Sequence, residues 1–156
     1  MEDGALAETV KKNAVRSRKY SSFFWMLPIS VWERKKGMIY IAGPYSGKTS
    51  SETSVNITRA RTAAMWCAKN LIRFFCPHTH TAHFEIAVPG TPKEFYYALD
   101  LKIAEICTAI MLLKNWEASV GAMKELAFFA DKKLPIFLFP VHSDTILEWA
   151  KKERAE

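Results

Sequence analysis

Beyond residue 37, short runs of hydrophobic residues alternate with longer segments in which hydrophobic residues recur every three or four positions. Continuous hydrophobic runs are typical of strands buried on both faces of a sheet, and the three-to-four spacing is typical of helices. The expected strands cover 38–43, 73–77, 108–113 and 134–140, and the expected helices cover 56–72, 93–107, 118–133 and 143–153. Strands separated by helices in this order predict an α/β fold with a parallel sheet covered on both faces.

Residues 1–37 show no clear period and end in ERKKG, immediately before Met38, where the first strand pattern begins. Glu, Arg, Lys and Gly can all be written with purine-only codons, and a purine-rich tract before a methionine codon resembles a bacterial ribosome-binding site. We therefore expect residues 1–37 to be an N-terminal extension, either disordered or the product of a mis-called start. The folded domain is expected over 38–156.

The net charge of +6 is concentrated near the N-terminus. Residues 1–37 hold eight Lys and Arg against four Asp and Glu, whereas the remainder holds fourteen against twelve. A domain with a net charge of only +2 does not favour a nucleic-acid polymer as the partner. Small molecules are the expected partners instead.

The hydrophobic stretch at 23–32 is ten residues long, about half of what a membrane-spanning helix needs, and no small-residue cleavage site follows it. The chain has three cysteines, an odd number, and no C-x-x-C pair, so neither a disulfide framework nor a zinc ribbon is indicated. We expect a cytoplasmic protein without a membrane partner.

The octet AGPYSGKT at 42–49 fits the looser form of the phosphate-binding P-loop motif, with Ala42 in place of the first glycine. Three features speak against a P-loop. No expected strand ends in the acid that would hold Mg²⁺, Pro44 removes a backbone N–H from the turn, and polar residues separate Lys48 from the clear helical period. A polar surface turn is therefore the favoured interpretation, with a P-loop as an alternative.

Three segments resemble the nucleoside 2-deoxyribosyltransferase-like superfamily, which includes small phage and bacterial members of unassigned function. IYIAGPYS resembles its first strand and loop, and LLKNWEASVGAMKELAFFA resembles its signature of Ser or Asp, then Gly, then Glu six residues after the Ser or Asp. YYALDLKIAEICTAI resembles the preceding helix, where an Asp lies about 25 residues before that Glu, as Asp100 does before Glu125. The resemblance covers about residues 38–140.

The helix expected at 118–133 carries the features of a ligand site. Ser119 is a good N-cap, and the amides of the first turn form an anion site. Gly121 and Glu125 lie on one face, so the carboxylate projects over a position without a side chain, where Gly121 leaves room for a ligand. By its pattern alone Glu125 is either a solvated helix glutamate or a site residue. The resemblance implies a nucleophile that attacks the anomeric carbon and forms a covalent sugar ester.

Two further residues have a site role and a plainer alternative. Asp100 is either an exposed residue or one turned into the site, where the resemblance implies that it shares proton transfer with the departing base. Tyr40 is either a core residue or, as the resemblance implies, directs its hydroxyl at the nucleophile. Relatives that hydrolyse nucleoside 5′-monophosphates carry Ser where those acting on free nucleosides carry Asp, so Ser119 favours a phosphorylated substrate.

The remaining candidates are expected to contact the substrate. Gly43, Pro44 and Tyr45 form the loop after the first strand, which shares a corner of the sheet with Ser119. His78, in the run HTHTAH, either contacts base or phosphate, or belongs to a metal site or an ordinary polar loop. Tyr96 and Tyr97 are also able to stack on a base, but Trp116 is the favoured aromatic residue because it begins a loop expected to face the crevice.

Together these features predict a single doubly wound, flavodoxin-like α/β domain with a mostly parallel sheet of four or five strands and helices on both faces. The expected activity is cleavage or transfer at the N-glycosidic bond of a (deoxy)ribonucleoside or its 5′-monophosphate. No cofactor and no metal are expected, and the resemblance implies a homo-oligomer. The alternatives are a non-catalytic nucleotide-binding module and a P-loop phosphotransferase that uses AGPYSGKT.

Overall fold

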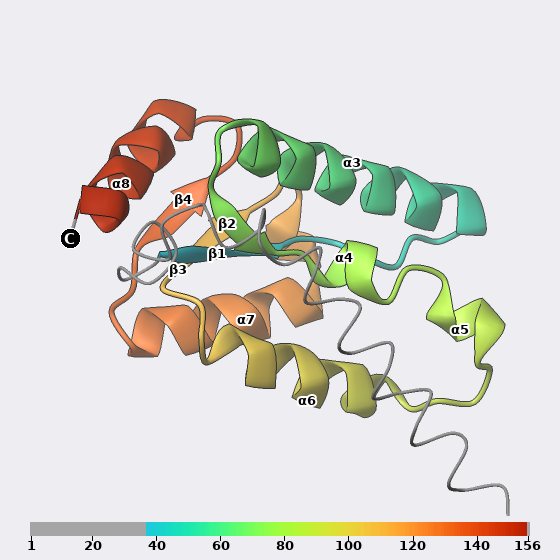
Figure 1. Cartoon of the computed structure of the whole chain (residues 1–156). Coiled ribbons are helices and arrows are strands. Elements are labelled where there is room, and N and C mark those ends of the chain that lie inside the picture. The colour runs from blue at the N-terminus through green and yellow to red at the C-terminus, as the bar shows by residue number, and fades with distance from the viewer. Residues whose placement is uncertain (1–36, 156) are drawn as a thin grey trace, which may run out of the picture. The chain divides into compact units, whose positions relative to one another are not determined.

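A computed structural model describes residues 37–155 of the protein (Figure 1). The strands are β1 (Met38–Ala42), β2 (Arg73–Phe75), β3 (Ala109–Leu112) and β4 (Ile136–Leu138). The helices are α3 (Ser50–Lys69), α4 (Pro77–His80), α5 (Phe84–Ala87), α6 (Lys93–Ala104), α7 (Val120–Asp131) and α8 (Ser143–Ala155), with a short 3₁₀ helix, η1 (Trp116–Ala118).

The four strands form one sheet in the order β2-β1-β3-β4, and every neighbouring pair is parallel. The predicted doubly wound α/β fold is therefore confirmed, with four strands in the described part of the chain. The chain moves outward from β1 to β2, then returns past β1 to reach β3. At such a reversal the loops that leave the two central strands diverge, which opens a crevice at the carboxyl ends of the strands.

Alternation along β1 divides the hydrophobic core between the two faces of the sheet. Ile39 and Ile41 pack with residues of α3 and α8, whereas Tyr40 and Ala42 pack with residues of α6 and α7. Figure 1 shows α3 and α8 on one side of the sheet and α6 and α7 on the other. This alternation places the Tyr40 side chain on the face that α7 covers.

Helix α3 begins at Ser50, six residues before the predicted start. The Thr49 side chain caps the helix by accepting a hydrogen bond from the Glu52 N–H, and the Glu52 carboxylate accepts one from the Lys48 N–H. Capping of this kind stabilises a first turn whose side chains are polar and exposed, which hydrophobic periodicity does not detect. The loop predicted between 78 and 92 likewise contains most of α4 and all of α5, which are single turns.

None of the helices within residues 37–155 is long and apolar enough to cross a membrane. The predictions for the N-terminal extension, including its hydrophobic segment at 23–32, fall almost wholly on residues 1–36 and so lie outside the described residues. The family-like segments at 38–140 all lie within the described part.

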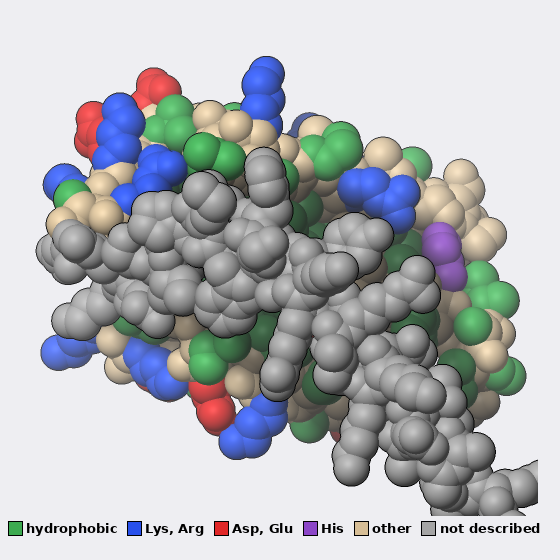
Figure 2. Space-filling model, viewed as in Figure 1, with side chains coloured by type: hydrophobic (Ala, Val, Ile, Leu, Met, Phe, Trp, Pro, Cys, Tyr) green, Lys and Arg blue, Asp and Glu red, His purple; other side chains and the backbone are tan. Residues whose placement is uncertain are grey.

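Helix α8 gives a direct test of the core. Its inner face buries Ile146 completely, and Figure 2 shows acidic and basic side chains on the surface where α8 lies. We expect Ile146→Ala to lower the free energy of unfolding by about 2–5 kcal/mol, because it leaves a cavity under the helix. Ile106→Ala is the matched control, since Ile106 is 67% exposed and its loss is expected to change stability by about 0.5 kcal/mol or less. Urea unfolding measures the stability of both variants. Equal losses of stability would contradict the packing of α8 against the sheet.

Candidate active site

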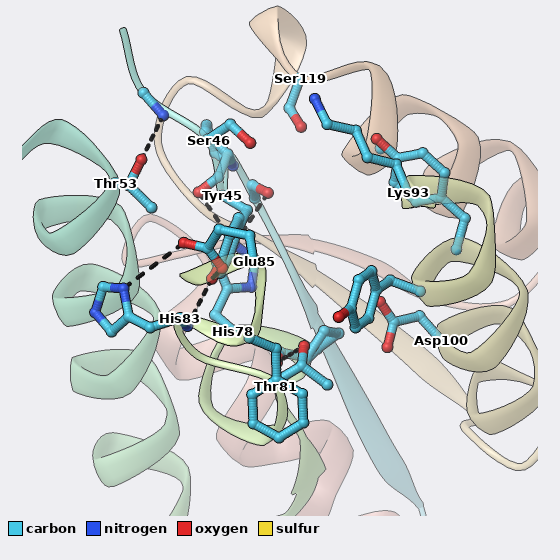
Figure 3. A pocket seen from close by; sticks show the side chains of 18 of the residues that line it. Tyr45, Ser46, Thr53, His78, Thr81, His83, Glu85, Lys93, Asp100 and Ser119 are labelled. Carbon is cyan, nitrogen blue, oxygen red and sulfur yellow. Dashed lines mark hydrogen bonds and ion pairs between the residues drawn. The ribbon is translucent and has the colours of Figure 1, made fainter. Parts of the chain in front are cut away.

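A cavity of about 870 Å³ opens at the carboxyl ends of β1, β2 and β3 (Figure 3). Its walls come from the loop after β1, the segment from α4 to the start of α6, one side of α6, and the N-terminus of α7. Eight of the ten residues predicted for the site line it: Gly43, Pro44, Tyr45, His78, Asp100, Ser119, Gly121 and Glu125. A cavity of this size accommodates a small organic ligand such as a nucleoside.

Tyr40 lies behind the cavity wall and contacts Glu125 directly. Its hydroxyl donates a 2.7 Å hydrogen bond to Glu125 Oε1, which joins the middle of β1 to the second turn of α7. The Tyr40 ring is fully buried between Phe75 and Phe129, with ring centroids 5.8 and 5.7 Å away. Glu125 is itself only 9% exposed, so it is not an ordinary solvated glutamate. The ring packing fixes where the hydroxyl points, and the hydroxyl fixes one carboxylate oxygen.

Burial controls the charge of Glu125 and Asp100, two of the acidic residues that line the cavity. It raises the pKa of Glu125 to about 7, with a further increase from the Asp100 charge and an opposing effect of the Tyr40 hydrogen bond. Burial likewise raises the pKa of Asp100 to about 6, against the opposing charge of His80. Two neighbouring carboxyl groups that change protonation near neutral pH are typical of sites that perform proton transfer or nucleophilic attack.

The N-terminus of α7 has the predicted cap. Ser119 Oγ accepts a 3.3 Å hydrogen bond from the Ala122 N–H, and the first turn of α7 lines the cavity. The room predicted beside Gly121 is partly filled by the Tyr97 ring, since a Cβ at Gly121 would lie 3.1 Å from Tyr97 Cε1. Gly121 therefore also serves the close approach of α6 and α7, which the spacing of Gly121 and Glu125 does not reveal.

The loop after β1 is tied to the segment after β2. His78 Nε2 lies 3.2 Å from the Gly43 carbonyl oxygen and 3.0 Å from that of Pro44. Tyr45 donates a 2.6 Å hydrogen bond to Glu85 Oε2 and accepts a 2.8 Å hydrogen bond from the His83 N–H. These contacts make one continuous wall from two distant segments. The pairing of Tyr45 with Glu85 carries no local sequence signal.

The three histidines of HTHTAH have separate surroundings. His78 is buried beneath the loop after β1, His80 is exposed and lies against Phe75, and His83 lies beside Glu85 on the surface. No group of three His, Cys, Asp or Glu side chains within residues 37–155 is arranged to hold a metal ion. His78 lines the cavity and holds the loop after β1, and its contact with a ligand stays a prediction.

The expectation that Trp116 faces the crevice is corrected by the structure. Trp116 lies in η1, packs against the core between the sheet and α7, and is not among the residues that line the cavity. The chain turns at Asn115, whose φ of 66° redirects η1 toward the core. The aromatic side chains that do line the cavity include Tyr45, Tyr96 and Tyr97.

The structure changes the argument about the P-loop motif. Lys48 and Thr49 do immediately precede a helix, so the third sequence argument against a P-loop was wrong. However, the Gly47 N–H donates to Thr53 Oγ1 at 3.0 Å, and the Lys48 N–H donates to the Glu52 carboxylate at 2.6 Å. These amides are the ones a P-loop presents to phosphate. A carboxylate of the chain itself already occupies that position.

Comparison with known proteins gives a family but no relative of established role. A family model described as a domain of unknown function, DUF4406, matches residues 37–138. This range contains all four strands and every residue of the cavity wall. No curated protein matches the chain.

The raised pKa of Glu125 makes stability depend on pH. A buried carboxyl group whose pKa rises from 4.5 to about 7 on folding costs nothing at low pH, and its cost grows as the pH rises through this range. We expect Glu125→Gln, which keeps the oxygen that accepts from Tyr40, to match the wild type near pH 4.5 and to be more stable by about 3 kcal/mol above pH 8. Chemical denaturation across this pH range measures the difference. Glu117→Gln on the exposed surface is the control, and a pH-independent effect of Glu125→Gln would contradict the assignment.

Proposed function

Because the chain belongs to the DUF4406 family, whose function is unknown, we propose its activity from the site. The proposed reaction is cleavage or transfer at the N-glycosidic bond of a (deoxy)ribonucleoside or its 5′-monophosphate. The observation that carries the proposal is the buried Glu125 carboxylate, held by the Tyr40 hydroxyl and close to Asp100, in a cavity of nucleoside size. The sequence motifs support a place for the family among the nucleoside 2-deoxyribosyltransferase-like proteins.

Glu125 is the proposed nucleophile. Tyr40 holds Oε1, so Oε2 is the oxygen that attacks C1′ of the sugar. The bond from C1′ to the base nitrogen breaks as the new C–O bond forms, and the electron pair leaves with the base. The product of this step is a sugar ester of Glu125. Water then releases the free sugar, or a second base attacks C1′ and gives a new nucleoside, and either event regenerates the carboxylate.

Asp100 is the proposed partner in proton transfer. It lies on α6, lines the cavity, and is close enough for its charge to raise the pKa of Glu125. In its protonated form it gives a proton to the departing base, and its carboxylate then takes a proton from the attacking water or second base. Interacting carboxyl groups share their protons, so the pair rather than either residue determines the pH dependence of the rate.

The region around Ser119 supports a phosphorylated substrate. The N-terminus of α7 faces the cavity, and helix N-termini favour anions. Lys93 also lines the cavity, and Figure 3 shows its side chain pointing toward Ser119. Within residues 37–155 no carboxylate forms an ion pair with Lys93. A 5′-phosphate in this part of the cavity would meet a hydroxyl donor, backbone amides and an ammonium group.

Two other functions remain as alternatives. A non-catalytic nucleotide-binding module would bind in the same cavity, but it has no need of two buried carboxyl groups, which cost stability. A P-loop phosphotransferase is disfavoured because Glu52 and Thr53 occupy the loop amides. It would show Mg²⁺-dependent ATP turnover that is lost in Lys48→Ala. A homo-oligomer and a cytoplasmic location belong to the proposal as well.

The first test is chromatography of the protein after incubation with deoxynucleosides and their 5′-monophosphates, singly and with a second free base. We expect release or exchange of base, with a rate that falls as the pH drops below about 7 because protonated Glu125 cannot attack. Glu125→Gln is expected to lower the rate by roughly 10³-fold or more, whereas the exposed control Glu117→Gln retains it. Binding without turnover in the wild type would favour the binding module.

The role of Ser119 is tested by two substitutions that both preserve a helix cap. Asp and Asn cap helices about as well as Ser, but only Asp adds a negative charge at the α7 N-terminus. We expect Ser119→Asp to lower kcat/KM for the monophosphate relative to the free nucleoside by roughly tenfold or more, by electrostatic repulsion. Ser119→Asn should change this ratio much less. Equal changes in both variants would show that the phosphate does not lie at this helix end.

A further inference from the structure

Two buried polar atoms in the described part of the chain have no hydrogen-bond partner: His78 Nδ1 and Asp100 Oδ1. Both residues line the same cavity, and they are only 4% and 8% exposed. A buried polar atom without a partner is costly, and native proteins satisfy nearly all of them. The pair therefore points to a ligand or an ordered water molecule that completes the site.

The hydrogen bonds of His78 determine what its free nitrogen is able to do. Nε2 lies within 3.2 Å of two backbone carbonyl oxygens, those of Gly43 and Pro44. Carbonyl oxygens only accept, so Nε2 carries the hydrogen and donates. Burial lowers the pKa of His78, which keeps the ring neutral near pH 7. Nδ1 is then an unprotonated nitrogen, and it is able only to accept.

Asp100 Oδ1 has the same character near neutral pH. An ionised carboxylate oxygen accepts hydrogen bonds and donates none. No described side chain or amide donates to Oδ1. The cavity thus offers two acceptors from different elements, α4 and α6, and lacks protein donors for either.

We propose that His78 is a specificity-determining residue, and that it accepts through Nδ1 a hydrogen bond from an N–H or O–H group of the substrate. Asp100 Oδ1 accepts a second such bond, both when the carboxyl group is ionised and when Oδ2 carries the proton that passes to the departing base. The inference rests on the proposed function for the identity of the substrate class. It adds that the bound nucleoside or nucleotide must present donors, rather than acceptors, to this part of the cavity.

Two groups of a nucleotide supply such donors. One is the base, through an exocyclic amino group or a ring N–H, and the other is a sugar hydroxyl. The Tyr45 ring, whose centroid lies 5.6 Å from that of the His78 ring, also lines the cavity and offers a surface on which a base is able to stack. Ligands that lack one donor at a time distinguish the two sources.

The chain allows a matched pair of substitutions at His78. In His78→Asn, Oδ1 takes the position of Nδ1 and retains the acceptor, but the donor to the loop after β1 is lost. In His78→Gln, the amide Nε2 takes the position of the imidazole Nε2 and retains the donor to Pro44, but the acceptor is lost. The pair separates contact with the substrate from support of the loop.

The experiment is calorimetric binding of the four common deoxynucleoside 5′-monophosphates to Glu125→Gln protein, which does not consume them. For the one that binds best, we compare analogues that lack the base donor or the 3′-hydroxyl. We expect one analogue to bind at least roughly tenfold more weakly, and His78→Gln to weaken the parent nucleotide but not that analogue. His78→Asn should retain most of the affinity. Thermal unfolding monitors folding of both His78 variants.

The outcomes separate the inference from the proposed function. If both analogues bind as well as the parent, or if His78→Gln binds normally and His78→Asn does not, the free nitrogen is satisfied by water and the inference is wrong. The analogue comparison alone decides the matter if either variant fails to fold. If the inference fails in this way but the wild-type protein still releases base, the proposed function stands. Donor-dependent binding without base release would preserve the inference and remove the proposed activity.

Discussion

The hydrogen bond from Tyr40 to Glu125 connects the sheet to α7, whose N-terminal half forms one wall of the cavity. It requires a tyrosine on the face of β1 that α7 covers, a glutamate on the inner face of α7, and a ring held between Phe75 and Phe129. These requirements are met by one hydrophobic cluster, which contains residues of β1, β2, β3 and α7. A shift of one residue in β1 would turn the hydroxyl to the opposite face of the sheet. The core therefore positions the Glu125 carboxylate.

This arrangement is opposed by desolvation. Glu125 and Asp100 both lie in surroundings that favour their neutral forms, and the Asp100 charge makes ionisation of Glu125 still less favourable. Among the described residues, Glu125 Oε1 accepts a hydrogen bond from Tyr40, whereas Asp100 Oδ1 is buried without a partner. The hydrophobic layers on the two faces of the sheet offset this cost in folding free energy. Natural proteins commonly accept such locally unfavourable arrangements at functional sites and offset their cost elsewhere in the fold.

Much of the fold and part of the site follow from local sequence patterns. The buried strands have continuous hydrophobic runs, Ser119 has the chemistry of a helix cap, and alternation along β1 determines which face receives Tyr40. The start of α3 was misplaced because capping, not hydrophobic periodicity, determines it.

The features that sequence reasoning missed all depend on contacts between distant segments. Trp116 turned to the core because of the backbone at Asn115, and Tyr97 filled the space beside Gly121 because α6 approaches α7 closely. The free nitrogen of His78 exists only because two carbonyl groups from the β1 loop engage the other one. No spacing within a single segment records such pairings.

The carboxylate of Glu52 makes the two helix N-termini at the cavity, those of α3 and α7, electrostatically different. The N-termini of α3 and α7 both border the cavity, and each would attract an anion. Glu52 supplies a negative charge of the protein itself at α3, whereas α7 has no acidic residue in its first turn. Of these two helix ends, that of α7 is the more attractive to an anion. An elongated ligand with one negatively charged terminus would therefore have a favoured direction in the cavity, with that terminus toward α7.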